Sequence, residues 1–125
     1  MLFSDGQLPS ALYTAQEIRE AEARMIASGE ASLCELIDRA GQSAFELLQR
    51  EGKLNNKILV LAGYGNNGAD AYICATLLLE SGCDVSLFAF DRTDLGEGLG
   101  YAKAAFLAAG GHQLIDYKDA LQEAE

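Results

Sequence analysis

The residues most able to do chemistry are 63–70, which read Gly-Tyr-Gly-Asn-Asn-Gly-Ala-Asp. Their glycines fit the pattern G-x-G-x-x-G, in which bare backbone lets a phosphate approach main-chain amides closely. A helix that begins after such a loop directs its first N–H groups and its partial positive charge toward an anion. The sequence therefore predicts a site for a phosphate-bearing or similarly polar ligand.

The loop contains side chains, as well as backbone amides, that could bind a ligand. Asn66, Asn67 and Asp70 place two amides and a carboxylate within five residues, which supplies oxygen ligands for a hard cation and hydrogen-bonding groups for a sugar or a carboxamide. Each residue also has a purely structural interpretation, since Asp70 could cap a helix and an asparagine tolerates left-handed backbone angles. The set as a whole is therefore the candidate site.

The elements around this loop predict where it lies. Residues 58–61 form a continuous apolar run, Ile-Leu-Val-Leu, which is typical of a strand buried in a parallel sheet. A loop over 63–69, a helix over 70–81 and a second strand over 84–90 complete a strand–helix–strand unit. The loop then lies at the carboxyl end of a parallel strand, where open α/β sheets bind their ligands.

Two helices precede this unit and further elements follow it. The capping-box patterns Thr14 to Glu17 and Ser32 to Glu35 predict helices that run to about Ser28 and to Gly52. Gly41, inside the second helix, indicates a close approach of another backbone. The remaining expectations are an irregular lead-in over 1–13, a loop over 91–98, a helix over 99–109, a weak strand over 113–117 and the start of a helix over 119–125.

Composition limits the classes of function. The 125 residues carry a net charge of −10, which disfavours binding to nucleic acid or to an anionic membrane. The chain is long enough for one domain, and its apolar runs are far shorter than the ~20 residues that span a bilayer. Without a recognisable secretion signal, we expect a cytoplasmic protein. Three cysteines and the single His112 support neither a disulfide framework nor a zinc site.

The loop resembles the signature of the NAD(P)H-hydrate epimerases, the YjeF N-terminal domain, which reads approximately G-x-G-N-N-G-G-D-G. The likeness extends over roughly residues 8–117 and includes the Leu8-Pro9 segment and the Arg-Ala-Gly step at 39–41. It implies a Rossmann-like three-layer α/β/α sandwich with a mainly parallel sheet, preceded by two N-terminal helices and incomplete in this chain. Residues 14–125 would form this partial domain.

The resemblance also implies an activity: epimerisation of the R and S forms of NADH and NADPH hydrate, a repair of damaged nicotinamide nucleotides. Carried over by position, the substrate contacts are Asn66, Asn67, Gly68, Ala69 and Asp70, and Asn67 is a ligand of a potassium ion. Asp70 is the nearest candidate for the catalytic proton shuttle. The expected setting is a homo-oligomer, with fusion to a C-terminal ADP-dependent dehydratase as in the bifunctional members.

Two departures from the family pattern affect these expectations. Ala69 and Ala71 replace glycines, and a side chain at 69 would weaken binding if the family backbone has a positive φ there. The family's later V-D-A-[LF]-x-G-T-G segment, with its catalytic aspartate, is not matched by residues 119–125. We therefore expect a fragment of an epimerase that is inactive alone, with a sheet too narrow to shield its own edges.

Two other interpretations stay open at this point. One is an ordinary NAD(P)-binding Rossmann fragment, in which Asp91 at the end of the second predicted strand would bind a ribose and Arg92 a 2′-phosphate. The other is a non-catalytic binding module. The sequence does not distinguish NADH hydrate from NADPH hydrate as the preferred substrate.

Overall fold

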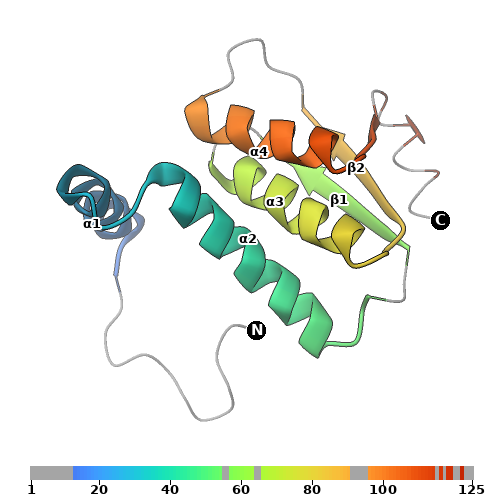
Figure 1. Cartoon of the computed structure of the whole chain (residues 1–125), viewed down its shortest axis with the longest axis horizontal. Helices are drawn as coiled ribbons and strands as arrows, with labels where there is room; N and C mark the ends of the chain where they lie inside the picture. The colour runs from blue at the N-terminus through green and yellow to red at the C-terminus, as the bar shows by residue number, and fades with distance from the viewer. Residues whose placement is uncertain are drawn as a thin grey trace.

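The computed structural model describes residues 13–54, 57–63, 66–90, 96–114, 116, 118, 119 and 122. In chain order its elements are α1 (Ala15–Ser28), α2 (Leu33–Arg50), β1 (Ile58–Ala62), α3 (Asn66–Glu80), β2 (Val85–Ala89), α4 (Glu97–Ala108) and β3 (Gln113–Leu114). The three strands form one parallel sheet in the order β1-β2-β3 (Figure 1). The predicted α/β class is confirmed.

The sheet buries alternate residues of β2 beneath the helices. Val85, Leu87 and Ala89 are buried, whereas the intervening Ser86 and Phe88 are only partly so. β1 pairs with β2 along its whole length, from Ile58 opposite Val85 to Ala62 opposite Ala89. The fully buried side chains of Leu78, Leu87 and Phe106 form the centre of the core, which therefore lies between the sheet and the helices α3 and α4.

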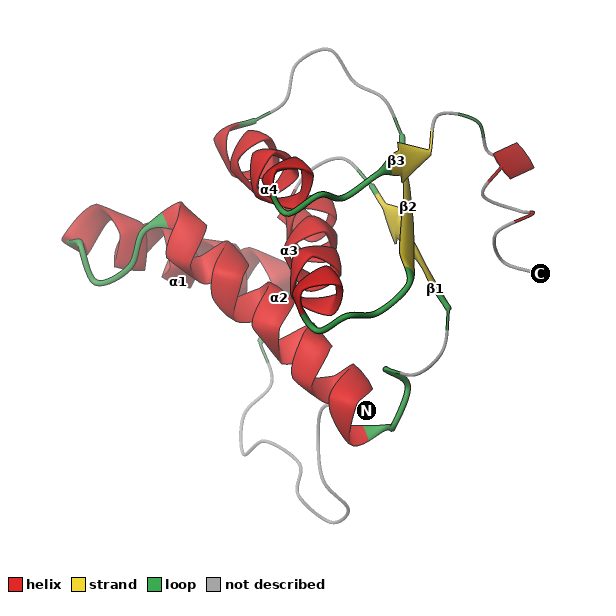
Figure 2. Ribbon diagram, turned by 45° about the vertical axis from the view of Figure 1, so that its right-hand side comes forward, coloured by secondary structure: helices red, strands yellow, loops and turns green. Residues whose placement is uncertain are grey.

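Helices α2, α3 and α4 all lie on one side of the sheet (Figure 2). Among the described elements, no helix packs on the opposite face. Of the three layers predicted, the described part of the chain thus contains two. Parallel sheets are normally covered by helices on both faces. In the described part of this chain, helices cover only one face of the sheet.

The two predicted helix starts are present, and one of the two capping boxes is complete. The Thr14 hydroxyl accepts from the Glu17 amide at 3.1 Å, and the Thr14 amide donates to the Glu17 carboxylate at 3.0 Å. At α2 the Ser32 hydroxyl accepts a hydrogen bond from the Glu35 amide at 3.1 Å. The Glu35 carboxylate accepts from the Ser32 hydroxyl at 3.4 Å, whereas a complete capping box has it accept from the backbone amide.

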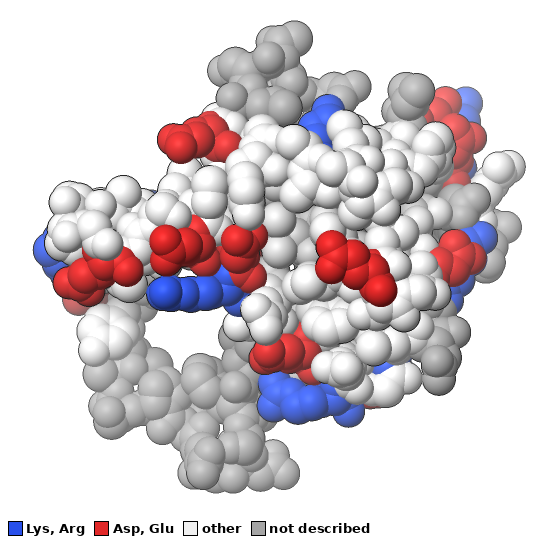
Figure 3. Space-filling view, viewed as in Figure 1, with Lys and Arg blue, Asp and Glu red and all other residues white. Residues whose placement is uncertain are grey.

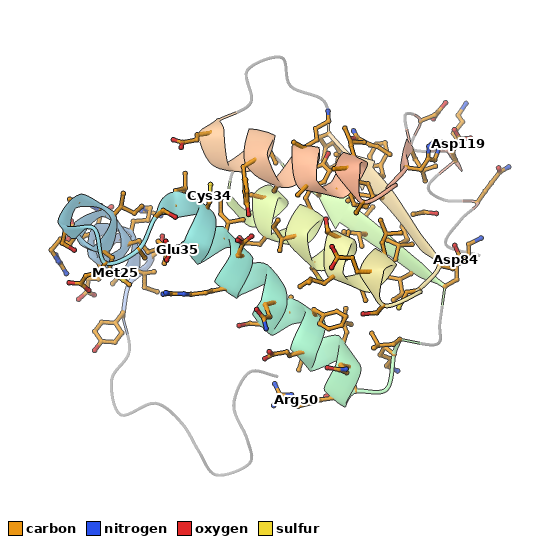
Figure 4. The ribbon with its side chains drawn as sticks, viewed as in Figure 1. Met25, Cys34, Glu35, Arg50, Asp84 and Asp119 are labelled. Carbon is orange, nitrogen blue, oxygen red and sulfur yellow. The ribbon has the colours of Figure 1, made fainter. Side chains whose placement is uncertain are left out.

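Glycine and a basic side chain terminate these helices. Gly29, with φ at 80°, ends α1, and Gly52, with φ at 69°, follows α2 as predicted. Arg50 lies in the last turn of α2 (Figure 4), where a positive charge stabilises the negative end of the helix dipole.

Gly41 allows the close packing of α2 against α3, as expected from the sequence. A β-carbon at this position would lie 2.5 Å from Ile73 Cγ2 and 3.1 Å from the Asp70 carbonyl oxygen. The absence of a side chain at Gly41 therefore brings α2 close to the turn of α3 that carries Asp70.

The predicted loop over 63–69 is wrong in its second half. α3 begins at Asn66, four residues before the predicted start at Asp70, so that Asp70 lies inside the helix and does not cap it. The physical reason is tertiary, because the early turn buries Gly68 and Ala69 against the core and this overrides the weak helix propensity of Asn and Gly.

Other predicted boundaries differ less. α4 begins at Glu97 instead of 99, and β3 covers only Gln113–Leu114 of the expected 113–117. The lead-in, apart from Tyr13, and most of the helix expected over 119–125 lie outside the described residues. No helix in the described part of the chain is long and apolar enough to cross a membrane.

Candidate functional site

The candidate site lies where β1 ends and α3 begins. β1 ends at Ala62 and α3 starts at Asn66, so the connection is short and lies at the carboxyl edge of the sheet. The neighbouring strand ends at the same level, because the Phe90 amide donates to the Ala62 carbonyl at 3.3 Å. The N-terminus of α3 therefore faces the edge at which open α/β sheets bind ligands, as the sequence predicts.

Gly68 holds the short connection closed. A β-carbon at this position would overlap the carbonyl oxygen of Gly63, which is backbone and has little freedom to move. The first turn of α3 thus folds directly against the end of β1. Only glycine fits this close approach.

Ala69, which replaces a glycine of the family pattern, causes no backbone strain in this structure. No described residue other than glycine has a positive φ, and Ala69 is helical. Its side chain is fully buried in the core, where alanine suits a helix better than glycine does. Because the methyl group faces the core, Ala69 has only backbone to offer a ligand.

Asp70 is the one ionisable residue among positions 66–70, and the structure describes its side chain. Its half-buried carboxylate lines a hollow of about 60 Å³ together with Glu22 of α1 and apolar side chains of α2. Burial raises the pKa of Asp70, and the nearby negative charge of Glu22 raises it further. Asp70 therefore holds a proton more readily than an exposed aspartate does.

Glu22 was not a candidate in the sequence. It lies in another helix, far from Asp70 along the chain, and neither its type nor its spacing sets it apart from the other acidic residues of α1. Only the tertiary structure brings Glu22 and Asp70 to one hollow, which side chains of α2 also line.

The N-terminus of α3 is electrostatically open to an anion. Its first turn carries no acidic side chain, so the partial positive charge of the helix end is not neutralised from within. Backbone amides of residues 66–68 belong to this end. A phosphate group is the kind of ligand that such an end binds.

Several predicted site residues lie wholly or partly beyond the description. Asp91 and Arg92 lie outside the described residues, and of Asn66 and Asn67 the structure describes the helical backbone alone. The five residues 66–70 are brought together in the first five positions of α3.

The cysteines and the histidine take no part in this site. Cys74 is buried, and its burial raises the pKa of the thiol, which disfavours the reactive thiolate. The Cys83 thiol donates to the Leu54 carbonyl at 3.2 Å, and His112 is exposed. In the described part of the chain no cluster of three or more His, Cys, Asp or Glu side chains could hold a metal.

Comparison with known families matches residues 33–124 to the YjeF-related protein N-terminus. The chain belongs to this family. The match covers β1, the candidate loop and α3, including all five residues of the predicted site, so the resemblance seen in the sequence is confirmed.

Two curated proteins have sequences similar to this chain. The bifunctional NAD(P)H-hydrate repair enzyme Nnr of Escherichia coli is 35% identical over 105 residues, which is 83% of this chain and 20% of that protein. The NAD(P)H-hydrate epimerase of Rhodobacter capsulatus is 32% identical over 90 residues, 66% of this chain and 42% of that protein. This chain therefore aligns with less than half the length of either relative.

A solved structure confirms the fold. The yeast protein ynu0 superposes with a TM-score of 0.72 at 20% identity, over 83% of this chain and 46% of the yeast chain. The Rossmann-like arrangement of strands and helices is thus shared with a yeast chain that is about twice as long as the superposed part.

Proposed function

We propose that this chain contributes to the epimerisation of the R and S forms of NAD(P)H hydrate, with residues 63–70 as part of the nucleotide site. The observation that carries the proposal is the position of the family's double-asparagine loop, which leads from the carboxyl end of β1 into α3. Relatives that match this chain are named NAD(P)H-hydrate epimerase or bifunctional NAD(P)H-hydrate repair enzyme.

The geometry supports nucleotide binding through backbone. Gly68 adds no side chain of its own where α3 packs against Gly63, and the first N–H groups of a helix can receive an anion such as a pyrophosphate. Asn66 and Asn67, in the same turn, are the substrate-binding residues that we propose beside Gly68, Ala69 and Asp70.

The reaction needs little more than proton transfer. The hydrated carbon adjoins the ring nitrogen, whose lone pair helps to expel the hydroxyl group as water and leaves a flat iminium. Water then adds to either face, so that the atoms balance and only the configuration changes. A carboxyl group with a raised pKa suits the transfer of the proton to the departing oxygen and from the entering one, and Asp70 is the group that we propose.

We further propose a potassium ion, with Asn67 as one ligand. Amide, carboxylate and backbone oxygens are the donors that hard cations prefer, and Asp70 lies three residues after Asn67 in α3. When bound, the ion would supply positive charge beside the nucleotide. The cytoplasmic location, the homo-oligomeric state and the fusion to a dehydratase stay predictions.

Nucleotide binding tests the proposal directly. We expect titration calorimetry to show saturable binding of the hydrate, tighter than that of intact NADH and stronger in KCl than in NaCl. Gly68→Ala should abolish binding because it displaces the start of α3, whereas Gly100→Ala, whose β-carbon meets no described atom within 4 Å, should retain it. Equal affinity for hydrate and NADH would favour an ordinary dinucleotide-binding module instead.

The catalytic role of Asp70 is tested by measuring the rate of epimerisation. Asp70→Asn should slow the interconversion of a purified epimer by about 10²-fold or more, with a smaller change in KM, because it removes the proton-transfer group. Glu80→Gln, at the exposed end of the same helix, is the matched control. The rate is measured for the chain alone and together with the rest of a YjeF-related domain. An unchanged rate would exclude Asp70 as the proton shuttle.

A further inference from the structure

Glu22 lies on the inward face of α1. Within this helix only Ala21, Glu22 and Met25 are partly buried, and the other residues are exposed. The exposed residues include the other charged side chains of the helix, which are Glu17, Arg19, Glu20 and Arg24. Glu22 is therefore the one charged residue that α1 directs toward the rest of the molecule.

Glu22 and Asp70 line the same small hollow. Apart from these two carboxyl groups, the side chains that line it are apolar and come from α2, namely Leu33, Leu36, Ile37 and Ala40. Like charges repel more strongly beside apolar groups than in water, because the surroundings screen them less. Two ionised carboxyl groups at this hollow therefore oppose each other.

No cation at the hollow relieves this repulsion. None of the described residues that line it is a lysine or an arginine. Arg39 neighbours the lining residue Ala40 along α2, but its guanidinium group pairs with exposed Glu35 at 3.8 Å. Folding gains nothing from two acids in such a place, whereas an acid–base site uses the arrangement to retain a proton.

The rest of the surroundings of Asp70 carries no charge that would compete with Glu22. Asp70 also lines an apolar groove of about 430 Å³, to which α2 and β1 contribute only apolar side chains. The other titratable group described there is Cys74 of α3, and burial raises the pKa of its thiol, which keeps it neutral. Among the described residues that line these two spaces, Glu22 is thus the charged neighbour of Asp70.

We propose that Glu22 is a positioning residue of the candidate site, whose negative charge at the shared hollow keeps Asp70 in the protonated form that the reaction uses. Glu22 acts through Asp70 and not on the substrate. The inference rests on the proposed function, because it takes Asp70 as the proton shuttle.

The charge of Glu22 matters for both proton transfers. Asp70 gives its proton to the departing hydroxyl group, which leaves as water, and takes a proton back from the water that adds. A carboxyl group that is fully ionised at neutral pH cannot make the first transfer. Repulsion from Glu22 adds to the effect of burial and favours the protonated form of Asp70.

Titration of the Asp70 carboxyl group tests the proposal without any substrate. Its NMR chemical shift is followed against pH in the full chain, and Asp70→Asn identifies the signal. We expect Glu22→Gln to lower the titration midpoint of Asp70 by about 0.5 pH unit or more. Glu22→Asp, which keeps the charge on a shorter side chain, should restore most of the difference. The matched control is Glu20→Gln, which removes a charge from the exposed side of α1 and should leave the midpoint unchanged.

The pH profile of the epimerisation rate is a second readout, which a merely structural role of Glu22 would not move. In the assay proposed for Asp70→Asn, kcat/KM of Glu22→Gln should begin to fall at a lower pH than that of the wild type. At acid pH, where Asp70 is protonated in both proteins, the two rates should be equal.

Two results of the titration overturn the proposal: a midpoint of Asp70 that Glu22→Gln leaves unchanged, or one that Glu20→Gln lowers equally. A rate loss in Glu22→Gln that is the same at every pH also overturns it. If the midpoint moves as expected but the wild type converts no hydrate, the proposed function fails, and the coupling between the two carboxyl groups stands.

Discussion

The surroundings of Asp70 disfavour the ionised form of its carboxyl group. Burial between α2 and α3 raises the pKa of its carboxyl group, and Glu22 raises it further. Its pKa is about 3.9 in an unfolded chain, so the folded protein binds more protons than the unfolded protein in the range between the two pKa values. The free energy of unfolding contributed by Asp70 therefore falls as the pH rises through that range.

The first prediction is a pH-dependent gain in stability for Asp70→Asn. Relative to the wild type, the variant should become more stable as the pH rises from about 3.9, the pKa in the unfolded chain, through the raised pKa of the folded state. Urea unfolding at a series of pH values measures the difference. Glu22→Gln should reduce the pH dependence only in part, because burial is the larger cause. A stability difference that is constant with pH would contradict this account.

The second prediction concerns the closed start of α3. Gly68→Ala should lower the free energy of unfolding by about 2 kcal/mol or more, because the added methyl group overlaps the Gly63 carbonyl and either backbone must shift. Gly63→Ala, whose β-carbon meets no described atom within 4 Å, should change it by less than about 0.5 kcal/mol. Chemical denaturation measures both, and equal losses would show that the contact does not limit the fold.

At the scale of elements, the distance between α2 and α3 is set by the missing side chain of Gly41. Alanine is the better helix former by about 1 kcal/mol, so glycine in the middle of α2 has a cost that packing must offset. The neighbour on α3 is Ile73, whose Cβ would lie 2.6 Å from the new β-carbon and whose branched side chain is stiff. The close contact of α2 with α3 therefore requires glycine at position 41.

The third prediction compares two glycines in helices. Gly41→Ala should destabilise the protein by about 1–3 kcal/mol, because the helices must separate. Gly100→Ala in α4 should stabilise it by about 0.5–1 kcal/mol, because no described atom lies within 4 Å of its new methyl group. Thermal unfolding of both variants measures the difference in sign. Stabilisation by both substitutions would mean that α2 and α3 have room to spare.

At the scale of the whole molecule, the excess of acidic side chains opposes compact folding. The net charge is −10, and acidic groups are spread over the face shown in Figure 3. The ion pair between Arg39 and Glu35 is 3.8 Å long and exposed, so it offsets little of this repulsion.

The fourth prediction is that salt stabilises the fold. Raising NaCl from about 20 mM to about 0.15 M should raise the Tm, since the screening length falls to about 8 Å and the like charges repel less. A Tm that stays constant or falls would contradict a dominant role for repulsion. KCl at equal ionic strength is the informative comparison, because any rise beyond that in NaCl measures the proposed potassium site.

Local rules predicted much of the fold because they depend on neighbours in the chain. The hydroxyl and carboxylate of Thr14 and Glu17 meet three residues apart, and the glycines that end α1 and α2 lie where the helical pattern stops. The apolar run of β1 and the double-asparagine loop are contiguous in the same way. From these the chain could be read as a partial Rossmann-like domain with a nucleotide-binding loop.

The sequence by itself thus determined the order and type of the elements, the loop and the family. Only the tertiary structure decided that α3 starts at Asn66, that Glu22 lies beside Asp70, and that β1 and α2 border an open groove. These features depend on contacts between residues distant in the chain, whose free energy exceeds the local preferences of Asn and Gly. No spacing in the sequence reports such contacts.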